Sequence, residues 1–163
     1  MKEKYLNFLK MAKLLNDKFN IQPLLYGSLG LEVVTEANLN ADDVDVLVPE
    51  IFIKSKWNDF RQYLESQGYK MIDLHEHTFE NGNIHFSFAS IESLETFANI
   101  KLNEIKTQTR NKVYYKLLTL KQYLKVYEAS SKDSYRKRIN KNTKDESKIE
   151  FIKLHLEEKD EGI

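Results

Sequence analysis

Apolar positions along the 163-residue chain follow two spacings, one typical of helices and one typical of strands. Helical spacing marks residues 3–19, 55–67 and 91–98, and strand-length apolar runs mark residues 24–26, 44–48, 69–79 and 84–89. Helical spacing returns twice more, each time behind a Thr followed three residues later by Gln or Glu, at Thr119 and Thr143. The pattern predicts an α+β fold, a small mixed or antiparallel sheet flanked by helices, with a helical C-terminal portion.

The dipeptide Asn81-Gly82 separates two of the apolar runs and predicts a tight hairpin turn. With these two residues as the loop, Glu76 pairs with Ser87 and Thr78 pairs with His85. One face of the predicted hairpin is therefore polar and carries Glu76, while the other face is rich in phenylalanine.

Two carboxylates interrupt the most apolar of the predicted strands. Asp43 and Asp45 are two positions apart, so a strand presents both on one face. Like charges this close need a raised pKa or a cation between them. Mg²⁺ (or Mn²⁺) suits such a pair, because it is bound by carboxylates together with substrate phosphates. Two acids in a buried strand are costly unless they are used, so the pair predicts a metal site.

A site for two cations needs a further carboxylate, and the run at 69–79 offers Asp73 and Glu76. They are an odd number of positions apart, so one strand face cannot present both. Glu76 lies on the predicted polar face and is the candidate third ligand. His75 and His77 form an alternative His-x-His clamp, but no third His or Cys stands at ligand spacing, which favours half-buried strand residues.

A Gly-Ser turn precedes the acidic strand. Gly27 permits a tight turn, and Ser28 is placed to cap a helix that begins there. The free N–H groups of a helix start bind anions, so Gly27 and Ser28 are candidates for holding phosphates. An ordinary strand-to-helix turn would have the same two residues.

Composition limits the possibilities further. The absence of Cys excludes a disulfide framework and a thiolate metal site. No apolar run has the length of a membrane span, and the N-terminus lacks the apolar segment of a signal peptide, so we expect a cytoplasmic protein without a membrane partner. The length fits one domain with two lobes, a core at 1–98 and a basic helical portion at 99–163. Within 99–118, only an edge strand at 106–110 is predicted.

Charge is distributed unevenly although the net charge is zero. Residues 1–100 hold 9 Lys and Arg against 15 Asp and Glu, whereas residues 101–148 hold 14 against 5. An acidic half facing a basic segment suits a polyanionic substrate held between a metal site and cations. A solvated surface of Lys-rich helices explains the same counts. Tyrosines between these cations would also suit a nucleic-acid partner, but their helical spacing favours a place in the core.

The Gly-Ser turn and the Asp-x-Asp strand together resemble the signature of the nucleotidyltransferase superfamily, the fold of the polymerase beta palm and of antibiotic-modifying adenylyltransferases. The matching segments are Leu24-Leu25-Tyr26-Gly27-Ser28 and Asp43-Val44-Asp45-Val46-Leu47-Val48, in the family's order and at its spacing. The tail resembles that of small bacterial members in four segments, Tyr123-Leu124-Lys125-Val126-Tyr127, Lys132-Asp133-Ser134-Tyr135-Arg136, Lys144-Asp145 and Lys148-Ile149.

The resemblance implies an enzyme that moves a nucleoside monophosphate from an NTP, with ATP the expected donor, to an acceptor hydroxyl. Asp43 and Asp45 would be catalytic and hold Mg²⁺ or Mn²⁺. Gly27 and Ser28 would bind the phosphates, joined by a basic residue of the tail, for which Lys141 and Lys144 are the matching positions.

The third acid departs from the family pattern. The strand that usually carries it is Ile84-His85-Phe86-Ser87-Phe88 here, without an acidic residue. One interpretation is that Glu76 supplies the carboxylate from the neighbouring strand as a catalytic and metal-binding residue. The alternative is a catalytically degenerate nucleotide-binding or regulatory protein with the same fold.

Overall fold

The structure is a computed structural model that describes residues 2–132 and 141–161, excepting the side chains of residues 141–144 and 159–161. The α-helices are α1 (Lys2–Phe19), α2 (Gly27–Thr35), α3 (Trp57–Ser66), α4 (Ser93–Ala98), α5 (Leu120–Ser131) and α6 (Lys141–Glu161). Short 3₁₀ turns span Glu50–Ile53 (η1) and Leu102–Glu104 (η2). The strands are β1 (Leu24–Tyr26), β2 (Val44–Val48), β3 (Lys70–Asp73), β4 (Thr78–Asn81), β5 (Ile84–Ser90), β6 (Lys106–Arg110) and β7 (Val113–Leu117).

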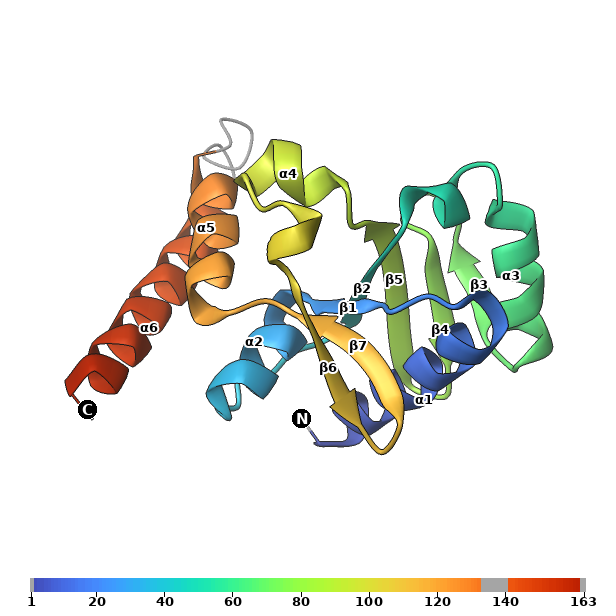
Figure 1. Cartoon of the computed structure of the whole chain (residues 1–163), viewed down its shortest axis with the longest axis horizontal. Helices are drawn as coiled ribbons and strands as arrows, with labels where there is room; N and C mark the ends of the chain where they lie inside the picture. Colours follow the sequence, from blue (N-terminus) through green and yellow to red (C-terminus); the bar gives the residue numbers. More distant parts are fainter. Residues whose placement is uncertain (1, 133–140, 162–163) are drawn as a thin grey trace.

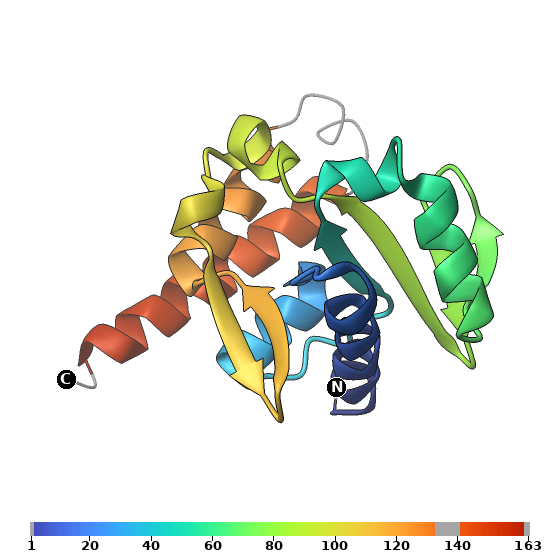
Figure 2. The ribbon, with the colours of Figure 1, turned by 45° about the vertical axis from the view of Figure 1, so that its right-hand side comes forward.

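The strands form one seven-stranded mixed sheet in the order β3-β4-β5-β2-β1-β7-β6. The pairs β2–β5 and β1–β7 are parallel, and the other neighbours are antiparallel. Helices flank this sheet, with α3 near one end of the molecule and α5 and α6 side by side near the other (Figures 1 and 2). The predicted α+β class and mixed sheet are confirmed. The sheet also continues past residue 98, because β6 and β7 extend it.

Successive side chains of the central strands pack alternately into two separate hydrophobic cores. Leu25, Val44 and Val46 join α1 and α3 in one apolar cluster, which is rich in aromatic rings. Leu24 and Leu47 point the other way and join α4, α5 and α6 in a second cluster. This two-sided burial explains the nearly continuous apolar sequence of β2, since a strand covered on both faces needs apolar side chains on both.

The predicted hairpin forms, but its register is shifted by two residues. Asn81 pairs with Ile84, which leaves Gly82 and Asn83 as the loop. Gly82 has a φ of 62°, a conformation that favours glycine, at the first loop position. Thr78 therefore pairs with Ser87, the place predicted for Glu76. A shift of two keeps each side chain on its predicted face, so the polar face remains.

The predicted strand at 69–79 is broken, because β3 ends at Asp73 and residues 74–77 form a turn. His77 has a φ of 51°, which is incompatible with an extended strand. Glu76 thus lies in a turn, and its side chain is 67% exposed. The prediction that Glu76 occupies the polar strand face is wrong.

The two predicted helix caps have different outcomes. Thr119 caps α5, accepting from the Gln122 amide N–H while the Gln122 side chain accepts from the Thr119 N–H. Helix α6 begins at Lys141, so Thr143 lies inside the helix and is not its N-cap. No helix in the described part of the chain is long and apolar enough to cross a membrane.

Candidate functional site

The turn from β1 into α2 places a glycine directly against an acidic side chain. Tyr26 at the end of β1 pairs with Asp45 of β2, and α2 begins at the next residue, Gly27. Gly27 has a φ of 65°, and a Cβ added there would overlap the carboxylate of Asp45. Glycine is therefore required twice, by the backbone conformation and by the space that the carboxylate occupies.

Ser28 does not cap the helix, contrary to the sequence prediction. The residue before α2 is Tyr26, which makes no side-chain capping bond, and Ser28 lies in the first turn. Its hydroxyl instead faces Tyr127 of α5 and acts to lower the pKa of that phenol. Ser28 and Tyr127 both line one pocket, so the start of α2 faces α5 there.

A second close approach fixes α5 over the same turn. Tyr123 is fully buried, and its hydroxyl donates to the Leu25 carbonyl of β1 over 2.8 Å. A Cβ on Gly30 of α2 would overlap both the Tyr123 hydroxyl and the Leu25 carbonyl. The absence of a side chain at Gly30 thus allows α5 to pack closely on the β1–α2 turn.

Asp43 and Asp45 interact electrostatically but lie in unequal environments. The Asp43 side chain is 52% exposed, just before β2 begins. Burial, and secondarily the charge of Asp43, raise the pKa of Asp45 to about 6. Both causes disfavour the ionised form of Asp45, and a cation beside the pair would relieve them.

The strand beside Asp45 carries hydroxyl and imidazole groups instead of a third acid. Ser87 of β5 pairs with Asp45, and its hydroxyl lies 2.8 Å from that of Thr78. His85 lies 3.9 Å from Asp43 through Nδ1 and 3.0 Å from Glu80 through Nε2. The acid on the polar face of the hairpin is therefore Glu80, which was not predicted.

Glu76 does not join the aspartates. Its backbone N–H donates to Asp73, and its carboxylate lies 3.9 Å from His75. Among the residues that the structure describes, no three His, Cys, Asp or Glu side chains are grouped so that they could hold a metal ion. The predicted set of Asp43, Asp45 and Glu76 is thus not assembled, and a cation there would rely on the two aspartates.

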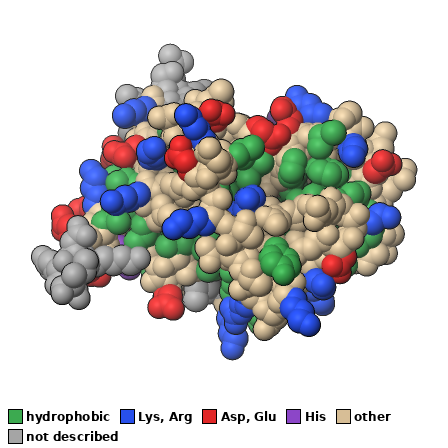
Figure 3. All heavy atoms as spheres, viewed as in Figure 1, with side chains coloured by type: hydrophobic (Ala, Val, Ile, Leu, Met, Phe, Trp, Pro, Cys, Tyr) green, Lys and Arg blue, Asp and Glu red, His purple; other side chains and the backbone are tan. Residues whose placement is uncertain are grey.

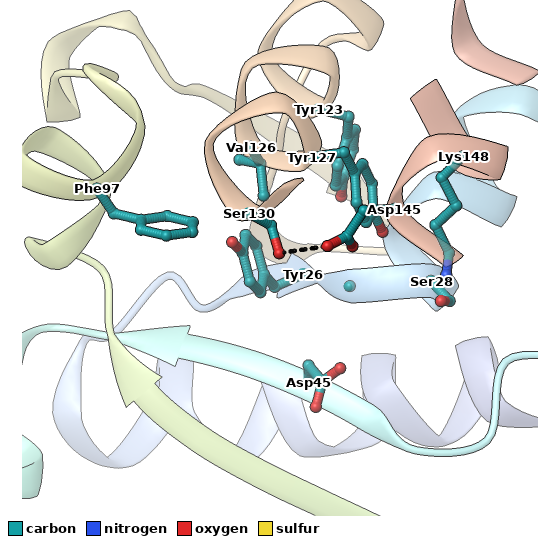
Figure 4. A pocket seen from close by; sticks show the side chains of 11 residues that line it. Tyr26, Ser28, Asp45, Phe97, Tyr123, Val126, Tyr127, Ser130, Asp145 and Lys148 are labelled. Carbon is teal, nitrogen blue, oxygen red and sulfur yellow. Dashed lines mark hydrogen bonds between the residues drawn. The ribbon is translucent and has the colours of Figure 1, made fainter. Parts of the chain in front are cut away.

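A pocket of about 360 Å³ opens over the Gly27 turn (Figure 4). Its walls come from the β1–α2 turn, β2, α4, α5 and α6, and the lining residues are Tyr26, Gly27, Ser28, Asp45, Phe97, Tyr123, Val126, Tyr127, Ser130, Asp145 and Lys148. Segments more than a hundred residues apart in the sequence thus meet at one cavity.

Polar groups of α5 and α6 cluster in this pocket. Asp145 is buried, at 4% exposure, and its Oδ2 accepts a hydrogen bond from the Ser130 hydroxyl over 2.9 Å. Burial first, and then the nearby Tyr26, Asp45 and Asp145, raise the pKa of the Tyr127 hydroxyl, while Ser28 acts to lower it. The Lys148 ammonium lies 5.6 Å from the Tyr127 ring centre. The charges of both pocket carboxylates, Asp45 and Asp145, therefore act on the Tyr127 hydroxyl.

Among the residues that the structure describes, Lys148 is the cation of the tail that lines the pocket. Lys141 and Lys144 fall in the first turn of α6, and their side chains lie outside the described residues. Lys148 follows Lys144 by four residues, one helical turn, and would share its face of α6. That spacing is the signal that could have identified Lys148.

Comparison with known proteins places the chain in a family. No model of a known protein family matches the sequence. The chain is 43% identical over 148 residues to the uncharacterized protein YnaI of Bacillus subtilis (strain 168), covering 91% of this chain and 94% of YnaI. The chain belongs to the YnaI family. Because YnaI is itself uncharacterized, the function of this YnaI-family protein has to be inferred from its site.

One buried acid of this YnaI-family protein holds the segment that leads to the aspartates. Glu32 of α2 is 1% exposed, and its Oε1 accepts from the backbone N–H groups of Leu39 and Ala41, each over 2.9 Å. Ala41 is four residues from Asp45. Glu32 therefore positions the chain just before β2.

Replacing Glu32 by Ala is expected to destabilise the protein by about 2–4 kcal/mol, because two N–H groups lose their acceptor where water is scarce. Urea unfolding would measure this loss. Glu32→Gln keeps an acceptor oxygen and should retain most of the stability, and the exposed Glu95→Ala of α4 serves as the control. Equal stability of Glu32→Ala and Glu95→Ala would contradict the positioning role.

Proposed function

We propose that this YnaI-family protein is a nucleotidyltransferase, which moves a nucleoside monophosphate from an NTP to an acceptor hydroxyl with Mg²⁺ or Mn²⁺ bound at Asp43 and Asp45. ATP is the expected donor. The observation that carries the proposal is the contact between Gly27, at the start of α2, and the Asp45 carboxylate. An anion-binding helix start and a cation-binding acid pair lie side by side there, as a metal-bound triphosphate requires.

The donor set fits a hard divalent cation. Two carboxylates offer oxygen ligands, and Mg²⁺ commonly takes only one or two carboxylates and completes its shell with water and substrate phosphates. Asp45 has a pKa raised to about 6 by burial and by Asp43, so two ionised carboxylates there repel each other near neutral pH unless a cation neutralises them. A cation bound there would neutralise charge on the α-phosphate and on the leaving pyrophosphate.

The chain's own groups would hold the rest of the triphosphate. The N–H groups at the start of α2 and the Ser28 hydroxyl can donate to phosphate oxygens. Lys148 supplies a positive charge at the same pocket, the role expected of Lys141 or Lys144. In the reaction, the acceptor oxygen bonds to the α-phosphorus as the bond to the pyrophosphate oxygen breaks, and the hydroxyl proton passes to solvent.

A catalytically degenerate nucleotide-binding protein is the second candidate, favoured by one observation. Ser87 occupies the position paired with Asp45, and Glu76 lies away from the pair. Incubation with NTPs, Mg²⁺ or Mn²⁺ and a panel of hydroxyl acceptors, read by pyrophosphate release, separates the two. Release that Asp45→Asn abolishes supports the enzyme, whereas binding without release across the panel supports the degenerate protein.

A nucleic-acid partner is less well supported. Tyr115, Tyr123 and Tyr127 are buried and cannot stack on bases, and Tyr114 is 45% exposed. The remaining candidate, Tyr135, lies outside the described residues. On the face shown in Figure 3, Lys and Arg side chains are spread over the surface together with acidic side chains. These features favour a small nucleotide as the polyanion.

Lys148→Met is expected to weaken Mg²⁺–ATP binding about ten- to a hundredfold, because a charged contact with phosphate is lost. Adenosine, which has no phosphate, should be unaffected. Calorimetric titration would measure both affinities, with Lys153→Met, an exposed lysine of the same helix, as the matched control. Equal losses for ATP and adenosine would argue that Lys148 acts through the packing of α6.

A further inference from the structure

A buried carboxylate occupies the middle of the pocket. Asp145 comes from α6, and Ser130 of α5 donates to it across the gap between the two helices. In Figure 4, this pair lies between Phe97 on one side and Lys148 with Ser28 on the other. The pocket therefore has an aromatic end, a polar middle and a cationic end.

The aromatic end suits a planar ring. Phe97 of α4 is 44% exposed, and its ring points into the pocket (Figure 4). Tyr26 lines the cavity beside it. Nucleobases stack on such aromatic faces without regard to base identity.

The order of these three parts matches the order of groups in a nucleotide. With the phosphates at Ser28 and Lys148, a nucleotide that extends toward Phe97 passes its sugar over Ser130 and Asp145. Asp145 and Lys148 both line the pocket and are three residues apart on α6, so they lie on the same face within one helical turn. The proposed sugar position at Asp145 is therefore next to the proposed phosphate position at Lys148.

The chemistry of Asp145 selects what can lie there. An ionised carboxylate only accepts hydrogen bonds and repels phosphate, so it favours a neutral donor. Sugar hydroxyls are such donors, and acidic side chains accept from ribose hydroxyls in dinucleotide-binding proteins. The Ser130 bond to Oδ2 fixes the orientation of the carboxylate.

We propose, building on the nucleotide-binding function above, that Asp145 accepts hydrogen bonds from the ribose hydroxyls of the NTP, with Ser130 as its positioning residue. The site then prefers ribonucleotides to 2′-deoxyribonucleotides. Base identity contributes less, since stacking at Phe97 reads no base edge.

The test compares ATP with dATP, each with Mg²⁺, by calorimetric titration of the full chain. Wild-type protein should bind ATP about tenfold more tightly than dATP, as a hydrogen bond to a charged group predicts. Asp145→Asn keeps an oxygen for Ser130 and should bring the ratio close to one, chiefly by weakening ATP. Glu150→Gln, at an exposed position of α6, is the matched control and should keep the wild-type ratio.

If Asp145→Asn does not fold, Ser130→Ala is the alternative test variant. It should lower the ratio of ATP affinity to dATP affinity, because the Asp145 carboxylate loses the bond that orients it. Equal affinities for ATP and dATP in the wild-type protein would overturn the assignment and leave the proposed function standing. If Asp145→Asn weakens the binding of ATP and dATP equally and also lowers the melting temperature, the Ser130–Asp145 hydrogen bond only connects α5 to α6, and the assignment is overturned. Failure of the wild-type protein to bind either nucleotide would overturn both proposals.

Discussion

Asp45→Asn is expected to raise the melting temperature of the metal-free protein while abolishing Mg²⁺-dependent nucleotide binding. Burial and the charge of Asp43 raise the pKa of Asp45 from 3.8 to about 6, so the ionised carboxylate is less stable in the folded protein than in the unfolded chain. The difference corresponds to up to about 3 kcal/mol at neutral pH. An amide of the same size removes this cost but also removes a ligand for the cation.

The sign of the pH dependence follows from the same shift. Because the folded state binds the Asp45 proton more tightly, the stability that protonated Asp45 contributes is fully present below about pH 3.8 and is lost as pH rises through about 6. The stability gain of Asp45→Asn in EDTA should therefore be largest at pH 7 and small at pH 4. Nucleotide binding in Mg²⁺ should instead strengthen as pH rises through 6, because a metal ligand must be deprotonated.

Asp42→Asn, an exposed neighbour, is the matched control and should change neither property. Thermal unfolding in EDTA and calorimetric titration with Mg²⁺–ATP measure the two effects separately. Unchanged nucleotide affinity in Asp45→Asn would remove the metal-site proposal. Loss of stability in EDTA would contradict the unfavourable burial of the ionised carboxylate.

The local part of the candidate site was predictable from the sequence. The i, i+2 spacing of Asp43 and Asp45 gives their common face in any strand, and the short segment after Gly27 allows β1 and β2 to pair as neighbours. The overlap that a Cβ on Gly27 would make with Asp45 is a consequence of that pairing. The local geometry of the β1–β2 pair therefore followed from its sequence, whereas the predicted helix caps at Ser28 and Thr143 did not form.

The register of the β4–β5 hairpin was harder to predict from the sequence than the presence of its turn. Asn81-Gly82 and Gly82-Asn83 both provide a two-residue loop, and both leave the apolar residues of β4 and β5 on the same faces. Alternation alone cannot distinguish registers that differ by two. The turn at residues 74–77, in which His77 has a positive φ, removed Glu76 from the strand.

The remote part of the site was not predictable from spacing. Asp145 and Lys148 reach the pocket because α6 packs on α5, and Phe97 does so because α4 lies beside α5. These contacts depend on the parallel pairing of β7 with β1, which joins the C-terminal portion to the sheet. A one-dimensional pattern holds no information on which helix faces which cavity.

Gly27→Ala is expected to abolish Mg²⁺-dependent nucleotide binding and to destabilise the protein. The φ of 65° costs an alanine about 1–2 kcal/mol, and the new Cβ must in addition displace the Asp45 carboxylate. Displacement moves a proposed metal ligand away from the start of α2, so binding should fall more than about a hundredfold, comparable to the loss of several kcal/mol of interaction. Urea unfolding and titration with Mg²⁺–ATP measure the two consequences.

Gly82→Ala separates the steric effect from the backbone effect. Gly82 has a φ of 62°, almost that of Gly27, but a Cβ there would meet nothing within 4 Å. Backbone strain should therefore lower the free energy of unfolding of both variants by about 1–2 kcal/mol. Only Gly27→Ala should also lose nucleotide binding. If the two variants bind Mg²⁺–ATP equally well, the close approach of Gly27 and Asp45 serves packing alone, and the proposal loses the observation on which it depends.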